Sequence, residues 1–105
     1  MESRARKLAI LLAAPPGSRN FTHAIKLADA AQRHSVEVYL YCLDEAVAGI
    51  TQTELQSLKG SGVRLFGCAY AAQKRSIAIS DSATFAGLAT LSDLIAATDR
   101  FVTFA

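Results

Sequence analysis

Short apolar runs alternate with amphipathic stretches along this chain of 105 residues, and this alternation constrains its fold more than any other feature. The first run, Leu8 to Ala13, is almost unbroken, which is typical of a strand buried on both faces of a parallel sheet. Apolar residues then recur at helical spacing from Phe21 and end near His34. A second strand is expected over residues 36–43, which are rich in β-branched and aromatic side chains. The chain therefore begins with a strand, a helix and a second strand.

The remaining sequence continues the same alternation. A loose segment over 46–50 is followed by a helix that is capped by Thr51 and Glu54 and ended by Gly60 and Gly62. A strand over 63–66 and a short helix over 69–75 come next. The chain then ends with a strand over 85–88, a helix capped by Thr90 or Ser92, and a strand over 101–104. Alternating strands and helices form parallel sheets with right-handed crossovers. The sequence predicts an α/β fold, a three-layer α/β/α sandwich around a mainly parallel five-stranded sheet.

Length and composition narrow the class of protein. Hydrophobic residues make up 51% of the chain, enough for one core, so we expect a single domain over residues 1–105 with a flexible tail over 1–7. The net formal charge is only +2, which gives no strong field for binding nucleic acid or anionic membranes. The apolar run ends at Pro15, well short of the roughly 20 residues that a membrane helix needs. We expect a cytoplasmic protein without a membrane partner.

The two cysteines, Cys42 and Cys68, form no CxxC motif and have no histidine cluster beside them. This pattern argues against a zinc site and against a disulfide framework, so we expect free thiols, no metal and no cofactor. His23 and His34 lie eleven residues apart on the charged first helix, and we interpret both as surface residues.

Cys68 is the strongest candidate for chemistry. Ligand sites in parallel sheets lie at the carboxyl ends of the strands, and Cys68 falls between a strand and the start of a helix. Backbone N–H groups at a helix start favour a thiolate, and Lys74 and Arg75 follow within two turns to add positive potential. We expect this corner to be exposed. The alternative interpretation is that Cys68 is a small buried hydrophobic residue.

Two weaker candidates lie at the same edge. Cys42 ends the second strand and is a possible second thiol, although core packing explains it equally well. The loop from Pro15 to Asn20 runs into a helix and resembles a phosphate-binding turn, but it matches neither the Walker A nor the GxGxxG spacing. A small flavodoxin-like nucleotide-binding protein is therefore one alternative function.

Three segments resemble the DsrE/TusD sulfur-relay family, which also includes DsrF-like proteins. Residues 68–77 read CAYAAQKRSI and are similar to the family's cysteine followed by an alanine-rich helix that ends in Arg-Gly, with Ser76 in place of the glycine. Residues 85–94 read FAGLATLSDL and are similar to its G-L-x-x-L-x-x-L stretch. Residues 98–104 read TDRFVTF and are similar to its terminal D-R-V-V-x-F strand. The N-terminal strand and the loop with Pro15, Pro16 and Gly17 are also similar to the family, so the resemblance covers nearly the whole chain.

The resemblance implies a sulfurtransferase that accepts sulfane sulfur as a persulfide on Cys68 and passes it to a partner thiol, in tRNA thiolation or sulfur oxidation. It implies a trimeric or hexameric homo-oligomer, or a hetero-oligomer of related subunits, with a small TusA-like sulfur carrier as exchange partner. Some family members lack a working cysteine, so a non-catalytic structural subunit is the other function that the resemblance allows.

Overall fold

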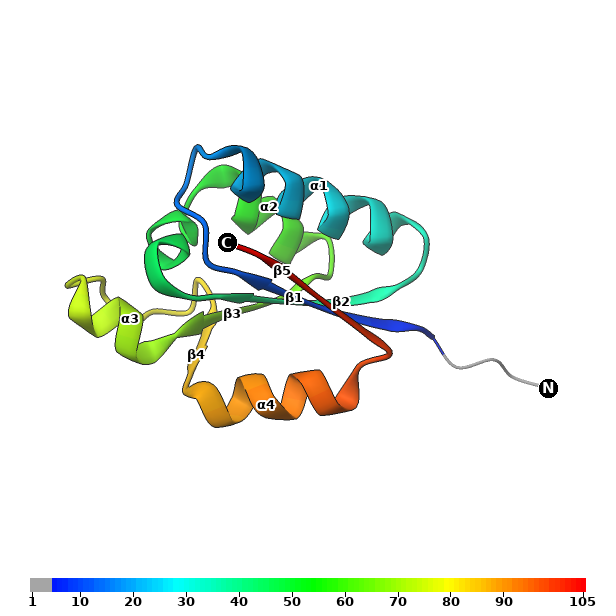
Figure 1. The fold of residues 1–105 in the computed structure, drawn as a ribbon. Helices are drawn as coiled ribbons and strands as arrows, with labels where there is room; N and C mark the ends of the chain where they lie inside the picture. Colours follow the sequence, from blue (N-terminus) through cyan, green and yellow to red (C-terminus); the bar gives the residue numbers. More distant parts are fainter. Residues whose placement is uncertain (1–4) are drawn as a thin grey trace.

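The structure is a computed structural model that describes residues 5–105 (Figure 1). Residues 1–4, which make up most of the predicted tail, lie outside the described residues, and Lys7 already belongs to the first strand. In chain order the elements are β1 (Lys7–Leu12), α1 (Arg19–Arg33), β2 (Glu37–Cys42), the 3₁₀ helix η1 (Asp44–Gly49), α2 (Thr53–Gly60), β3 (Arg64–Cys68), α3 (Ala69–Lys74), β4 (Thr84–Ala86), α4 (Leu88–Ala97) and β5 (Arg100–Phe104).

The five strands form one parallel sheet in the order β4-β3-β2-β1-β5. From β1 to β3 the chain steps in one direction, and right-handed crossovers put α1 and α2 on one face of the sheet. It then returns from β4 to β5 across the sheet, and α4 lies on the opposite face (Figure 1). The predicted α/β fold, with a helical layer on each face of a five-stranded sheet, is confirmed.

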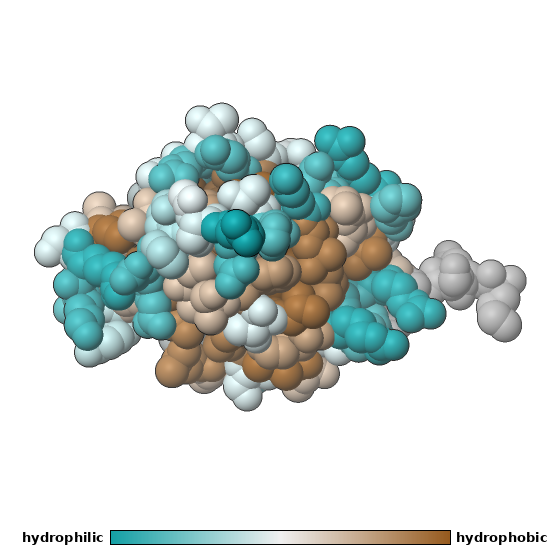
Figure 2. Space-filling view, turned by 45° about the horizontal axis from the view of Figure 1, so that its top comes forward, coloured by the Kyte–Doolittle hydropathy of each residue, from teal (hydrophilic) through white to brown (hydrophobic). Residues whose placement is uncertain are grey.

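The two faces of the sheet are covered unequally. The face beneath α1 and α2 carries the densest part of the core, which includes Ile10, Leu12, Val38, Leu40 and Cys42. On the other face, α4 has no buried residue, and Leu88, Ile95 and Phe101 remain exposed among the large hydrophobic side chains. Figure 2 shows hydrophobic side chains gathered in its lower half, toward α4 and β5.

Two helix starts differ from the prediction. The helix predicted to be capped by Thr51 begins at Thr53, and the backbone N–H of its cap residue Gln52 donates to the carbonyl of Gly49 instead. The helix predicted to be capped by Thr90 or Ser92 begins at Leu88. Neither helix has a side-chain cap. The loose segment over 46–50 folds largely into η1, which starts at Asp44 and ends at Gly49.

Gly67 shapes the end of β3. A Cβ atom on this residue would lie 2.7 Å from Cδ1 of Ile50 and 2.9 Å from Cε1 of Phe85, closer than side-chain carbons pack. The missing side chain lets Ile50 and the β4 residue Phe85 close over this face of the sheet. Only glycine fits here without displacing its neighbours.

Ser76 stands where the family pattern has glycine, and its backbone explains that pattern. It follows the cap residue of α3 and adopts a φ of 55°, in the left-handed region where helices commonly end on glycine. The backbone N–H of Ile77 donates to the carbonyl of Ala72 across this turn. Serine holds the turn at a cost that glycine would avoid.

Ser76→Gly should raise the free energy of unfolding by about 0.5–1 kcal/mol, because glycine adopts a positive φ without strain. Urea denaturation followed by circular dichroism measures the change. Ser57→Gly is the control, since Ser57 lies inside α2 and glycine in a helix interior should lower stability by roughly 0.5 kcal/mol. An equal decrease in the free energy of unfolding in both variants would show that the backbone of Ser76 is not strained.

Candidate functional site

Cys68 is the last residue of β3 and the cap residue of α3, so it lies at the strand-to-helix corner that the sequence predicts. Its Sγ accepts a hydrogen bond of 3.4 Å from the backbone N–H of Ala71. This is the position in which a serine or aspartate oxygen commonly caps a helix. This N–H group therefore ties the sulfur to the first turn of α3.

The side chain of Cys68 is less exposed than predicted. Only 3% of the residue is accessible, and Cys68 belongs to the same buried cluster as Tyr41. It nevertheless lines a cavity of about 350 Å³. The residues around this cavity come from the ends of β2, β3 and β4 and from α3: Leu43, Asp44, Cys68, Tyr70, Ala71, Lys74, Arg75, Gly87 and Leu88. Cys68 is therefore a nearly buried residue in the wall of this cavity.

Lys74 and Arg75, which the sequence singles out as cationic neighbours of Cys68, both line the same cavity. Both side chains are exposed, and neither pairs with a carboxylate among residues 5–105. A guanidinium nitrogen of Arg75 donates to the carbonyl of Ala71 at 3.3 Å, which holds this side chain against α3. Because both groups face solvent, water and salt screen their charges.

Cys42 lies on the opposite face of the sheet. It pairs in register with Gly67, and side chains alternate along a strand, so Cys42 points away from the face that carries Cys68. Both cysteines are free, and Cys42 is fully buried. Burial raises the pKa of the Cys42 thiol to about 12. The structure therefore places the two thiols on opposite faces of the sheet, and Cys68 is the cysteine that lines the cavity.

Tyr41 is a residue of this site that the sequence did not single out. It precedes Cys42, is 1% exposed and lies on the Cys68 face of the sheet. Its hydroxyl donates to the carbonyls of Ala86 and Gly87, at 3.0 and 3.2 Å. A buried tyrosine needs a partner for its hydroxyl, but only the pairing of β2 with β3 indicates that it lies beside Cys68.

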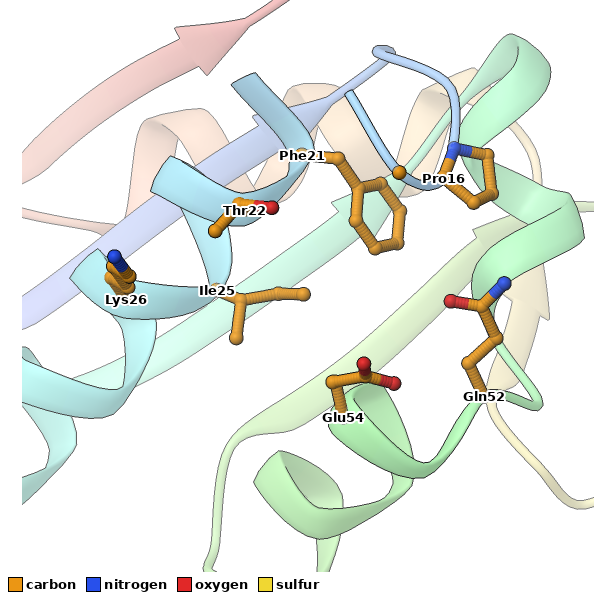
Figure 3. A pocket seen from close by; sticks show the side chains of 8 residues that line it. Pro16, Phe21, Thr22, Ile25, Lys26, Gln52 and Glu54 are labelled. Carbon is orange, nitrogen blue, oxygen red and sulfur yellow. The ribbon is translucent and has the colours of Figure 1, made fainter. Parts of the chain in front are cut away.

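The loop from Pro15 to Asn20 lines a separate cavity of about 370 Å³ (Figure 3). Phe21 and Ile25 point into this cavity, and Lys26 and Glu54 lie at its rim. Lys26 is the cation among the lining residues and Glu54 adds a carboxylate, which is a poor set of charges for a phosphate. Within residues 5–105 no three His, Cys, Asp or Glu side chains gather as a metal site, and no helix has the length and hydropathy to span a membrane.

Alkylation of the folded protein at pH 8 should modify Cys68 at least tenfold faster than Cys42, because Cys42 is protonated and sealed in the core. Mass spectrometry of the two cysteine peptides after timed exposure to iodoacetamide measures both rates. The unfolded protein serves as the reference, since its two thiols should react alike. Reaction of Cys68 only after unfolding would mean that the cavity gives no access to the sulfur.

The comparisons with known proteins agree with this fold. Residues 6–104 match the DsrE/DsrF-like family. The solved structure of the ychN protein from E. coli superposes with a TM-score of 0.81, covering 96% of this chain and 100% of that chain at 18% identity. A conserved protein of unknown function from Bacteroides thetaiotaomicron, BT1422, superposes with a TM-score of 0.76, covering 92% and 93% of the two chains at 16% identity. No curated protein matches the sequence. The match over almost its full length shows that this chain belongs to the DsrE/DsrF-like family.

Proposed function

We propose that this protein relays sulfur: Cys68 accepts a sulfane sulfur as a persulfide and passes it to a thiol of a partner protein. The observation that carries the proposal is the cavity at the carboxyl edge of the sheet, whose lining residues include Cys68, Lys74 and Arg75. Membership of the DsrE/DsrF-like family supports a function related to sulfur relay. On this proposal the protein is a sulfurtransferase.

Both half-reactions exchange one sulfur–sulfur bond for another. In loading, the Cys68 thiolate attacks the outer sulfur of a donor persulfide, and the donor cysteine leaves as a thiolate. In release, an acceptor thiolate attacks the outer sulfur on Cys68, the bond to Sγ breaks, and its electron pair returns to Sγ. Nothing is oxidised or reduced overall, so this route needs neither a metal nor an organic cofactor.

The surroundings of Cys68 suit an anionic sulfur. A thiolate and a persulfide anion are both negative, and Lys74 and Arg75 are the cations of the cavity. Free thiols such as Cys42 and Cys68 are characteristic of a reducing compartment, which supports a cytoplasmic location. We propose a small TusA-like carrier as the exchange partner and a trimer or hexamer, of one chain or of related chains, as the assembly. Either tRNA thiolation or sulfur oxidation fits this chemistry.

The alternative is a non-catalytic structural subunit of such an assembly. The 3% exposure of Cys68 favours it, because a thiol that no partner reaches serves only to fill space. The two functions differ in whether the sulfur takes up a second sulfur atom in the folded protein.

Incubation with a cysteine desulfurase and cysteine should add about 32 Da, the mass of one sulfur atom, to the Cys68 peptide. The Cys42 peptide of the same sample should gain nothing, since its thiol lies inside the core. Cys68→Ser should abolish the adduct, and Cys42→Ala should keep it. A second incubation with a thiol-bearing carrier protein should then remove the extra mass from Cys68.

An unmodified Cys68, under conditions that load a known relay protein, would reject the relay and leave the structural subunit. Loading of both cysteines equally would show that the reagent reacts with unfolded chains. In that case the sulfur uptake would say nothing in favour of the relay.

Replacing both cations of the cavity should slow the loading of Cys68. Lys74→Gln with Arg75→Gln should lower the rate by about two- to fivefold at low salt, because exposed charges contribute modestly. The difference should shrink in 0.5 M salt (about 4 Å Debye length). Lys26→Gln is the matched control, since Lys26 lines the other cavity. An equal rate in the double variant and in wild type would exclude an electrostatic role for the pair.

A further inference from the structure

The hydroxyl of Tyr41 is held at the wall of the Cys68 cavity. It donates to the carbonyls of Ala86 and Gly87, the corner between β4 and α4, and Gly87 itself lines the cavity. The Tyr41 ring stacks on Phe66, with 6.5 Å between ring centroids and an interplanar angle of 16°. A hydroxyl has only one hydrogen to donate, so it makes one strong hydrogen bond at a time. Because the Tyr41 hydroxyl already shares this hydrogen between two carbonyls, it can exchange one acceptor for another.

Sheet register brings the hydroxyl next to the sulfur. Tyr41 pairs with Phe66 in β3, and Cys68 lies two residues further on the same face. Cys68 in turn pairs with Ala86, the residue whose carbonyl the hydroxyl reaches. Burial and, next, the negative charge of a Cys68 thiolate raise the pKa of Tyr41 well above its ordinary value. Tyr41 thus stays protonated at neutral pH and remains a donor.

We propose that Tyr41 is a hydrogen-bond donor to the reacting sulfur: its hydroxyl turns from the carbonyls of Ala86 and Gly87 to Sγ of Cys68 whenever that atom carries negative charge. The inference rests on the proposed relay at Cys68. On loading, a donor at Sγ favours the thiolate that attacks, and on release it stabilises the thiolate that leaves. Between them the hydroxyl returns to the carbonyls and keeps the cavity wall in place.

Besides Cys68, the titratable and charged residues of 5–105 that line the cavity are Asp44 at the start of η1, Tyr70 and Lys74 on α3, and Arg75 at its end. The corner between β4 and α4 contributes Gly87 and Leu88, which do not titrate. These four charged or titratable residues are exposed, whereas Tyr41, which bonds the carbonyl of Gly87, is buried. A buried donor stabilises a negative charge on sulfur more strongly than a solvated donor does.

The test is the pH profile of Cys68 alkylation in Tyr41→Phe, with Tyr39→Phe as the matched control. Tyr39 lies two residues away on the same strand and face, but its hydroxyl bonds Glu37 at 3.4 Å. Tyr41→Phe should slow alkylation at pH 7 by about tenfold and move the half-maximal rate to higher pH, since a charge-assisted hydrogen bond is lost. Tyr39→Phe should follow the wild-type profile. Three coincident profiles would overturn the proposal.

A second measurement keeps the test open if Tyr41→Phe does not fold. The chain has three tyrosines, so a protein with Tyr39→Phe and Tyr70→Phe, labelled with ¹³C at tyrosine Cζ, reports Tyr41 alone. Its signal should shift at the pH where Cys68 alkylation is half-maximal, and Cys68→Ala should abolish that shift. A signal that is flat through this pH overturns the proposal. Neither experiment uses sulfur loading. The role of Tyr41 can therefore be rejected while the relay at Cys68 is kept, and the relay can be rejected while the role of Tyr41 is kept.

Discussion

Parallel pairing of β2 with β3 is the constraint on which the rest of the site depends. The register places Tyr41 beside Phe66 and Cys42 beside Gly67, so adjacent residues of β2 serve opposite faces of the sheet. Cys68 falls on the Tyr41 face, at the edge where the strands end. One face receives Tyr41, Cys68 and the cavity that Cys68 lines, and the other receives Cys42 and the side chains packed under α1 and α2. The register therefore decides which of the two cysteines lies at the cavity.

The strands and the alternation with helices could be predicted because they depend on local pattern. The apolar run from Leu8 differs from the strand in the structure by one residue at each end. Helix starts could not be predicted, because contacts from distant residues decide them. Gln56 donates to the carbonyls of Ile50 and Ser82, and the start of α2 follows η1 instead of Thr51. The hydroxyl of Tyr41 holds the carbonyls at the start of α4, a contact between residues 45 and 46 positions apart.

In the candidate site, too, the features set by nearby residues could be predicted and those set by distant residues could not. A cysteine between a strand and a helix, with two cations following, is visible in sequence, and the structure brings Cys68, Lys74 and Arg75 around one cavity. The burial of the sulfur is not visible, because the wall above it comes from the turn at Gly87, nineteen positions further along the chain. Tyr41 is absent from the prediction for a similar reason. Its role depends on which strand lies next to β2, and composition carries no such information.

Gly67 limits how this corner can be redesigned. Its missing side chain admits Ile50 and Phe85 on the core face, whereas the next residue points its sulfur to the cavity. A protein engineer who moved the cysteine back by one position would aim the sulfur at these two hydrocarbon side chains and lose the bond from Ala71. Lengthening the strand by one residue would exchange the two sides altogether. A cysteine that is to line this cavity from β3 is therefore restricted to position 68.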